Sequence, residues 1–279
     1  MLKVLKPGFF TTIQDVGRFG YRDKGVPVSG AMDMRALSKA NLLLENPVDA
    51  AVFEITMTGP TLLFEAPTFI CLTGAVISAT LNNEPIENYK VYAVDKGDIL
   101  SYGRLESGFR AYLAVKDGFR SKKILGSSSL YYPLTTKKCL TEKDEIEYNA
   151  IAAFDPKISE LKIDAYIDER QLTVSKGPEF DLLDDKQLKR LFSKEFTIAK
   201  ENNRMAYQLK EYLSEHAASM LTSATLPGTV QLTPAGRLII LMKDGQTTGG
   251  YPRVLQLSEN AITILAQKRA GNSIRFKLV

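Results

Sequence analysis

Short apolar runs separated by glycine and proline recur along most of this chain. The runs are rich in β-branched and aromatic residues and are too brief for typical helices, so they predict strands. The clearest of them cover residues 61–64, 68–72, 89–94, 98–102, 109–115 and 237–243. At the C-terminus, Ile274, Phe276 and Leu278 alternate with charged residues, as in a strand with one buried face. We therefore predict a mostly β (α+β) fold.

Three segments have helical spacing instead, so a few short helices are expected among the strands. The first covers residues 35–47, with Asp33 as its N-cap and Pro47 at its end. The second runs from Phe180 to Phe192. The third follows Ser258 as N-cap, and the pattern places two cations, Lys268 and Arg269, in its last turn, where they would complement the helix dipole.

The two halves of the sequence resemble each other faintly. Residues 59–74 align without a gap with residues 228–243, which places Gly59 on Gly228. This similarity suggests an internal duplication, although β-rich sequences also produce such similarity by chance. The charged stretch 155–168 is the candidate boundary, and we predict one domain over residues 1–160 and a second over residues 161–279.

Composition excludes several function classes. The net charge of +4 is too small an excess to indicate a nucleic-acid partner. No apolar run approaches the roughly 20 residues of a membrane span, and no secretory signal is recognisable, so we expect a cytoplasmic protein with no membrane partner. Cys71 and Cys139 are then expected to be reduced thiols.

Cofactor motifs are also missing from the sequence. His216 is the sole histidine, and it is expected to pack or to lie at the surface rather than to act as a base. No group of Cys and His has metal-ligand spacing, so no metal site is predicted. Neither a phosphate-binding loop nor a dinucleotide fingerprint is present.

A polar, glycine-rich segment over residues 11–33 is the first candidate site. Gln14, Asp15, Arg18 and Ser29 would form a polar wall. The planar guanidinium of Arg18 suits a carboxylate, a carbonyl or a phosphate, and Asp15 would orient it or accept a proton. In the alternative interpretation, Asp15 and Arg18 form an ion pair that only fixes the loop.

Glu54 lies between Phe53 and Ile55 in a strand-like segment. A carboxylate at the mouth of a barrel would serve as a general acid or base. The alternative places Glu54 on the solvent face of its strand.

The run 237–243 leads into a segment of small polar residues, which is the second candidate site. Hydroxyl and amide side chains could bind a ligand there, and the paired glycines would let backbone N–H groups approach it closely. Asp244 is a candidate for proton transfer, and a turn before an edge-strand Pro252 is the alternative. The substrate-binding candidates are Arg204, Gln231, Gln246, Thr247, Thr248, Gly249, Gly250 and Tyr251.

Several of these segments together resemble one protein family. TTIQDVGRFGY, GVPVSGAMD, KANLLLEN, FEIT followed by GPTLLF, and QTTGGYPRV occur in the order typical of the KipA family, from about Val4 to Phe276. That family is also called allophanate hydrolase subunit 2, or the biotin-dependent carboxyltransferase family, and it includes the C component of 5-oxoprolinase. The resemblance implies two cyclophilin-like β-barrel domains.

The same resemblance implies a hydrolase subunit that is active only in a complex. The expected partners are a KipI-like subunit and a third, lamB-type subunit, which together would open 5-oxoproline to glutamate with ATP. One alternative is a urea carboxylase-like carboxyltransferase that receives biotin from another chain. Another is a KipA-type antagonist of a KipI-like kinase inhibitor. The chain departs from the family at Arg204-Met205-Ala206 and in the glycine-poor loop after Gly126.

Overall fold

The computed structural model describes residues 1–162, 165–216 and 220–279. They form two compact units: the first comprises Met1–Arg18 and Ser29–Ile167, and the second comprises Phe19–Val28 and Asp168–Val279. A short arm of N-terminal sequence thus belongs to the second unit. The division between residues 160 and 161 stays a prediction, since compact units of contacting residues need not fold as separate domains.

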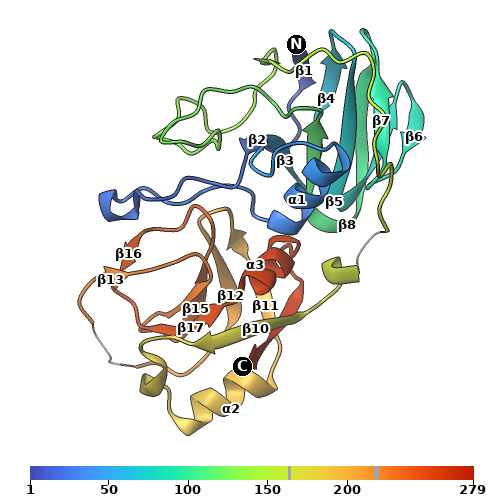
Figure 1. The fold of residues 1–279 in the computed structure, drawn as a ribbon. Coiled ribbons are helices and arrows are strands. Elements are labelled where there is room, and N and C mark those ends of the chain that lie inside the picture. Colours follow the sequence, from blue (N-terminus) through green and yellow to red (C-terminus); the bar gives the residue numbers. More distant parts are fainter. Residues whose placement is uncertain (163–164, 217–219) are drawn as a thin grey trace. The chain divides into compact units, whose positions relative to one another are not determined.

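The first unit is built on one nine-stranded antiparallel sheet, and the predicted mostly β fold is confirmed (Figure 1). Strands β2, β3, β8, β4, β1 and β9 are neighbours in this order, while β5 pairs with β6, β7 and β8. The bounds are β1 Leu2–Lys6, β2 Phe10–Gln14, β3 Val52–Thr56, β4 Thr61–Phe64, β5 Thr68–Leu81, β6 Glu84–Ile86, β7 Val91–Val94, β8 Ile99–Val115 and β9 Glu145–Ile146.

Strand β8 joins two segments that were predicted as separate strands, 98–102 and 109–115. Glycines inside β8 mark local irregularities rather than its ends. Gly103 packs so closely against Ser78 that a Cβ atom would lie 2.6 Å from the serine hydroxyl. Gly108 has a φ of 78°, and the register between β5 and β8 shifts in this region.

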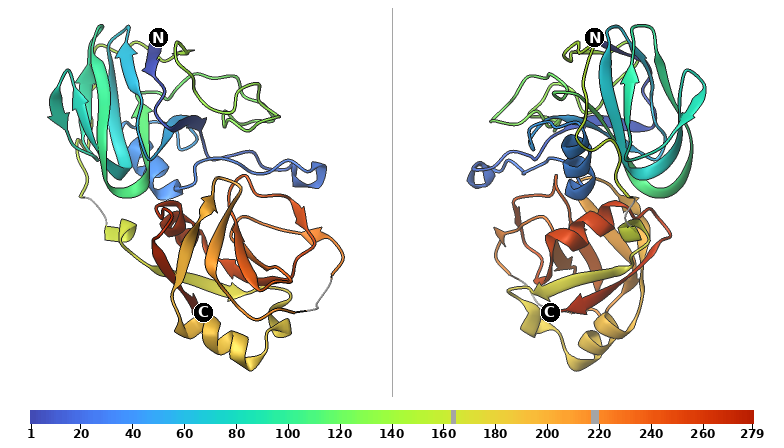
Figure 2. Two further views of the ribbon diagram at one scale, coloured as in Figure 1. Left: turned by 180° about the vertical axis from the view of Figure 1, so that it is seen from behind. Right: turned by 45° about the vertical axis from the view of Figure 1, so that its right-hand side comes forward.

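Helix α1 (Met34–Leu43) packs on the sheet of the first unit (Figure 2). Asp33 is its N-cap as predicted, since its carboxylate accepts a hydrogen bond from the N–H of Ala36 at 2.9 Å. The helix makes β3 a strand that is buried on both faces. Phe53 and Ile55 point into the main apolar core, whereas Val52 joins the cluster beneath α1.

The second unit is a closed seven-stranded barrel with the order β10-β17-β14-β15-β12-β11-β18. A separate pair, β13 (Ser223–Ala224) and β16 (Thr248–Gly249), lies outside it. In β18, Ile274 and Phe276 are buried as predicted, while Leu278 is exposed at the strand end. The barrel strands are β10 Gln171–Lys176, β11 Phe196–Asn202, β12 Ala206–Tyr212, β14 Thr229–Leu232, β15 Arg237–Leu241, β17 Arg253–Leu257 and β18 Ser273–Leu278.

The two segments aligned as a possible repeat differ in their pairing. Strand β14 forms a hairpin with β15. Its counterpart β4 pairs with β1 and β8 instead. The internal duplication therefore stays a prediction.

The predicted helix at 180–192 is divided in the structure. A 3-10 turn, Phe180–Leu182, precedes helix α2, Asp185–Ser193. The α-helix begins late because Asp184 and Gln187 form a capping box, which fixes its first turn. Two further 3-10 turns cover Arg22–Lys24 and Ala165–Ile167.

Helix α3 (Glu259–Ala266) has Ser258 as its N-cap, as predicted. The placement of Lys268 and Arg269 in its last turn is wrong, because the helix ends before them. The chain turns there into β18, where the N–H of Gly271 donates to the carbonyl of Ile198 at 2.9 Å. Lys268 is buried instead, and this burial lowers its pKa.

Both cysteines are free thiols, as expected, and burial raises the pKa of Cys71 to about 12. Among the described residues, no helix combines the length and the apolar character that a membrane span requires.

Candidate functional site

The carboxylate of Asp15 holds a loop of three serines. It is buried directly after β2 and accepts hydrogen bonds from the N–H of Gly17 at 2.8 Å and from the N–H of Ser128 at 2.6 Å. The hydroxyls of Ser127 and Ser129 also donate to it, each at 2.6 Å. Three of these donors bind Oδ1 and one binds Oδ2, so the protein holds both carboxylate oxygens in place. The geometry favours an orienting role for Asp15.

Arg18 binds the same serine loop from the other end of the QDVGR segment. Its guanidinium is buried, and its Nη2 donates to the carbonyl of Ser129 at 2.5 Å. Gln14 is also buried, and its amide donates to the hydroxyl of Thr12 and to the carbonyl of Leu130. Three predicted site residues thus meet at residues 127–130.

Ser29 lies beside this network in a strained backbone conformation. Its φ is 55°, and the following Gly30 packs so closely that a Cβ would lie 2.8 Å from the backbone nitrogen of Gly17. The Ser29 side chain is fully buried, and its hydroxyl has no hydrogen-bond partner among the residues that the structure describes. A strained residue with an unused buried hydroxyl is typical of a ligand-binding segment.

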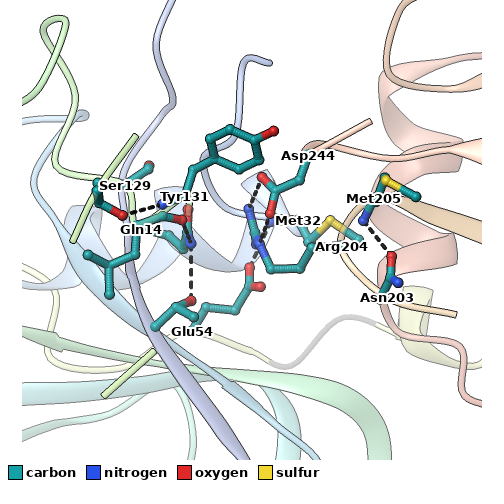
Figure 3. A network of polar contacts seen from close by, with 12 residues as sticks. Gln14, Met32, Glu54, Ser129, Tyr131, Asn203, Arg204, Met205 and Asp244 are labelled. Carbon is teal, nitrogen blue, oxygen red and sulfur yellow. Dashed lines mark hydrogen bonds and ion pairs between the residues drawn. The ribbon is translucent and has the colours of Figure 1, made fainter. Parts of the chain in front are cut away.

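Glu54 is buried on β3 beneath the start of α1, so the alternative that placed it on the solvent face is wrong. Its carboxylate accepts from the N–H of Met32 at 2.8 Å (Figure 3). It also accepts from the hydroxyl of Tyr112 at 2.7 Å. The Nε atom of Arg110 lies 3.6 Å away. The solvent-face alternative fails because Met32 and the start of α1 cover the face of the strand that an isolated sheet would expose.

The Glu54 network continues through two tyrosines. The hydroxyl of Tyr112 also accepts the N–H of Asp33 at 2.8 Å. The carboxylate of Asp33 accepts the hydroxyl of Tyr166 at 2.6 Å, so this side chain joins the end of the first unit to the N-cap of α1. Burial, followed by the charges of Glu54 and Asp33, raises the pKa of Tyr112, which therefore keeps the proton that it donates.

In the second unit, Arg204 and Asp244 form a bidentate ion pair. The Nε and Nη2 atoms of Arg204 lie 2.8 and 3.1 Å from the two carboxylate oxygens (Figure 3). The backbone N–H of Asp244 also donates to the carbonyl of Arg204 at 2.9 Å. The pair ties the turn between β11 and β12 to the turn after β15. Both residues were predicted for the site, and the structure joins them to each other.

The QTTGGY segment alternates between buried and exposed positions. Thr247 and Gly249 are buried, whereas Gln246, Thr248, Gly250 and Tyr251 are exposed. Gly249 packs beside the Gln231 amide: a Cβ there would lie 2.4 Å from its nitrogen. The side chains of Gln246, Thr248 and Tyr251 are thus open to solvent, and a ligand can reach them.

Residues 223–225 hydrogen-bond to this loop and fix its backbone, and they were not identified from the sequence. Ser223 and Ala224 pair with Gly249 and Thr248 in the β13–β16 ladder. Next to them, the N–H of Thr225 donates to the carbonyl of Thr247 at 3.0 Å, and its hydroxyl donates to the carbonyl of Gln246 at 2.5 Å.

Two arginines donate hydrogen bonds to the backbone carbonyls of residues 224 and 225. Arg22, from the arm that joins the second unit, donates to the carbonyl of Thr225. Arg253 donates to the carbonyl of Ala224 at 2.6 Å and forms a bidentate pair with Glu179. No short-range sequence signal links these residues to the loop, since Thr225 is an irregular residue after β13 and Arg22 is far away in the chain.

The Glu179–Arg253 pair gives a pH-dependent prediction. Hydrogen bonding by Arg253 lowers the pKa of Glu179 below its ordinary value of about 4.3. The pair therefore stabilises the folded state above that pH, and the contribution is lost as the pH falls through the lowered pKa. We expect the melting temperature of the wild type to fall more steeply below pH ~4.5 than that of Glu179→Gln, as followed by circular dichroism. Parallel pH curves for the two proteins would contradict this expectation.

Among the described residues, no group of three His, Cys, Asp or Glu side chains could hold a metal ion. The ring of His216 lies 3.0 Å from the carbonyl of Thr233, which is a packing arrangement. The serines of residues 127–129, Arg110, Tyr112 and Thr225 were not singled out from the sequence. Of these, only the run of three serines after Gly126 offered a local signal.

Residues 24–278 match the family described as "Carboxyltransferase domain, subdomain A and B". The chain is 31% identical to the 5-oxoprolinase C component of Escherichia coli over 99% of its own length and 90% of that protein. The solved structure of TTHA0988 superimposes on 99% of the chain with a TM-score of 0.90 and 26% identity, and the chain spans 55% of it. The urea amidolyase of K. lactis superimposes with a TM-score of 0.87 and 27% identity over 99% of the chain, which spans 18% of that protein.

Proposed function

Because this chain belongs to the carboxyltransferase family of subdomains A and B, and matches a relative named as a 5-oxoprolinase component over nearly the full length of both, we propose that it is a subunit of a 5-oxoprolinase. That full-length match carries the proposal. The complex would open the lactam of 5-oxoproline to glutamate, with ATP consumed and with a KipI-like and a third, lamB-type subunit as partners. ATP would be bound together with those partners.

The chemistry requires stabilisation of a developing negative charge. A lactam is a stable amide, and phosphoryl transfer to its oxygen turns that oxygen into a leaving group. Water can then add to the carbon, and the ring C–N bond breaks once the nitrogen is protonated, which leaves an acyl phosphate. A second water hydrolyses this acyl phosphate to the free carboxylate of glutamate and inorganic phosphate. Donors such as the Arg18 guanidinium, the Ser29 hydroxyl and the Thr248 hydroxyl are the group types that stabilise an oxyanion.

The three carboxylates proposed for proton transfer differ in how they are engaged. Asp15 has four donors on its oxygens, and Asp244 is held bidentately by Arg204. Glu54 instead accepts from the hydroxyl of Tyr112, which is a titratable phenol, whereas the hydroxyls on Asp15 belong to serines. We therefore propose Glu54 as the acid–base group and assign Asp15 and Asp244 to orienting roles.

A carboxyltransferase role is the second candidate, and the similarity to the urea amidolyase of K. lactis favours it. The chain has no biotin-attachment sequence, so biotin would be carried by another protein. A third possibility, a KipA-type antagonist, needs binding to a KipI-like protein but no turnover.

Reconstitution distinguishes these functions. The purified chain is mixed with the KipI-like and lamB-type proteins of its native cell, and ADP release is followed with and without 5-oxoproline. We expect release that depends on 5-oxoproline and on this chain. Thr248→Val should reduce the rate at least tenfold, about 1.4 kcal/mol of transition-state stabilisation, while the exposed control Thr58→Val should not. Carboxyl transfer from carboxybiotin without such ADP release would instead establish the second candidate, and complex formation without either reaction would establish the third.

A further inference from the structure

Helix α2 presents a row of cations on one face. Lys186, Lys189 and Arg190 follow each other at helical spacing, and Lys194 lies at the C-cap. All four side chains are exposed, whereas Gln187 and Leu191 on the adjoining face are buried. The helix thus packs on the barrel by one side and carries its positive charge on the other.

These cations border a cavity in the second unit. The cavity has a volume of about 460 Å³, which is within the range for small-molecule sites, and the start of β11 and the end of β12 complete its wall. Phe196, which is buried at the start of β11, contributes to its lining. A charged rim above an apolar surface is suited to a small organic ion.

The two carboxylates in the cavity wall already have partners. Glu211 accepts the N–H and the hydroxyl of Thr197 at 2.5 and 2.7 Å. Glu195 forms an ion pair with Arg275 at 2.7 Å. Within the described part of the chain, by contrast, none of the four cations forms an ion pair. The cavity lining therefore carries four cations against two carboxylates, and it keeps a net positive charge.

The dipole of α2 accounts for only part of this arrangement. Arg190 and Lys194 lie near the C-terminal end, where cations are favourable. Lys186 lies in the first turn, where the dipole disfavours a cation. An interaction with a bound anion would offset that cost.

We propose that this cavity binds a small organic anion with two or more carboxylate or phosphate groups. The proposal does not depend on the 5-oxoprolinase assignment, because it concerns residues apart from the candidate site. Lys189 and Arg190 are its main ligands, since both lie in the middle of the cationic face. Arginine adds a planar fork that suits either anionic group.

Titration calorimetry on the full chain tests the proposal, with pyrophosphate and citrate as probes at an ionic strength of about 0.05 M, where screening is weak. We expect saturable binding of at least one probe, and a loss of affinity of at least tenfold in Lys189→Gln/Arg190→Gln, about 1.4 kcal/mol. The control Lys200→Gln/Lys277→Gln removes the same charge from exposed barrel positions outside the cavity and should change affinity by less than about twofold.

Binding of pyrophosphate alone would identify a phosphate-bearing ligand, and binding of citrate alone a polycarboxylate; both support the proposal. Two results would overturn it: no saturable binding of either probe, or an equal loss of affinity in the two double variants, which would mean that net charge alone attracts the anion. Melting temperatures of both variants near that of the wild type establish that any loss is local.

Discussion

Replacing Glu54 with leucine is expected to lower the free energy of unfolding by about 3–5 kcal/mol. The carboxylate is buried beside Arg110, and it accepts hydrogen bonds from Met32 and Tyr112. Leucine would leave the arginine charge without this carboxylate and the two donors without an acceptor, all in a buried place. Urea unfolding followed by circular dichroism measures the loss.

Glu54→Gln separates the charge from the hydrogen bonds. The amide keeps an acceptor oxygen, so we expect a smaller loss of about 1–3 kcal/mol. Glu84→Gln, at an exposed position on β6 of the same sheet, is the matched control and should stay within about 0.5 kcal/mol of the wild type. Stability unchanged in Glu54→Leu would mean that the carboxylate does not hold the start of α1. Activity lost in Glu54→Gln beyond what its stability explains would support the acid–base proposal.

Local chemistry made much of the fold predictable. Short β-branched runs gave most of the strands, and Asp33 and Ser258 were identified as N-caps, because capping depends on neighbours within one turn of chain. The long strand β8 was divided wrongly because a glycine can end a strand or bend it, and only the partner strand decides which. The end of α3 likewise depends on a contact with distant Ile198.

The candidate site was predictable in its residue types but not in its pairings. The polar segments that contain Asp15, Arg18 and Thr248 were recognised because many hydrogen-bonding groups adjoin apolar runs. The partners of such residues lie far away in the sequence. Arg18 and its partner Ser129 are 111 residues apart, and Arg204 and Asp244 are 40 residues apart. Glu54 shows the same limit, since its burial results from a helix that precedes it in the chain.

Replacing Asp15 with alanine is expected to release the serine loop and to lower the free energy of unfolding by about 3–5 kcal/mol. Two backbone N–H groups and the hydroxyls of Ser127 and Ser129 would lose their acceptor in a buried place. Hydrogen exchange followed by mass spectrometry should show faster exchange at residues 127–130. Because Arg18 donates to the carbonyl of Ser129, the arginine would lose its fixed position as well.

Asp15→Asn tests whether the carboxylate orients the loop or transfers a proton. Its amide oxygen can still accept from part of the donor set, so an orienting role predicts a partial effect: intermediate stability, intermediate exchange at residues 127–130, and a rate in the reconstituted complex that falls in proportion. The exposed Asp155→Ala is the control for loss of an aspartate. If Asp15→Asn kept wild-type stability and exchange but abolished turnover, the orienting role would be wrong, and the carboxylate would act on the substrate itself. We expect the proportional result, because four donors from the protein, three on Oδ1 and one on Oδ2, fix the carboxylate in the position from which it holds the serine loop.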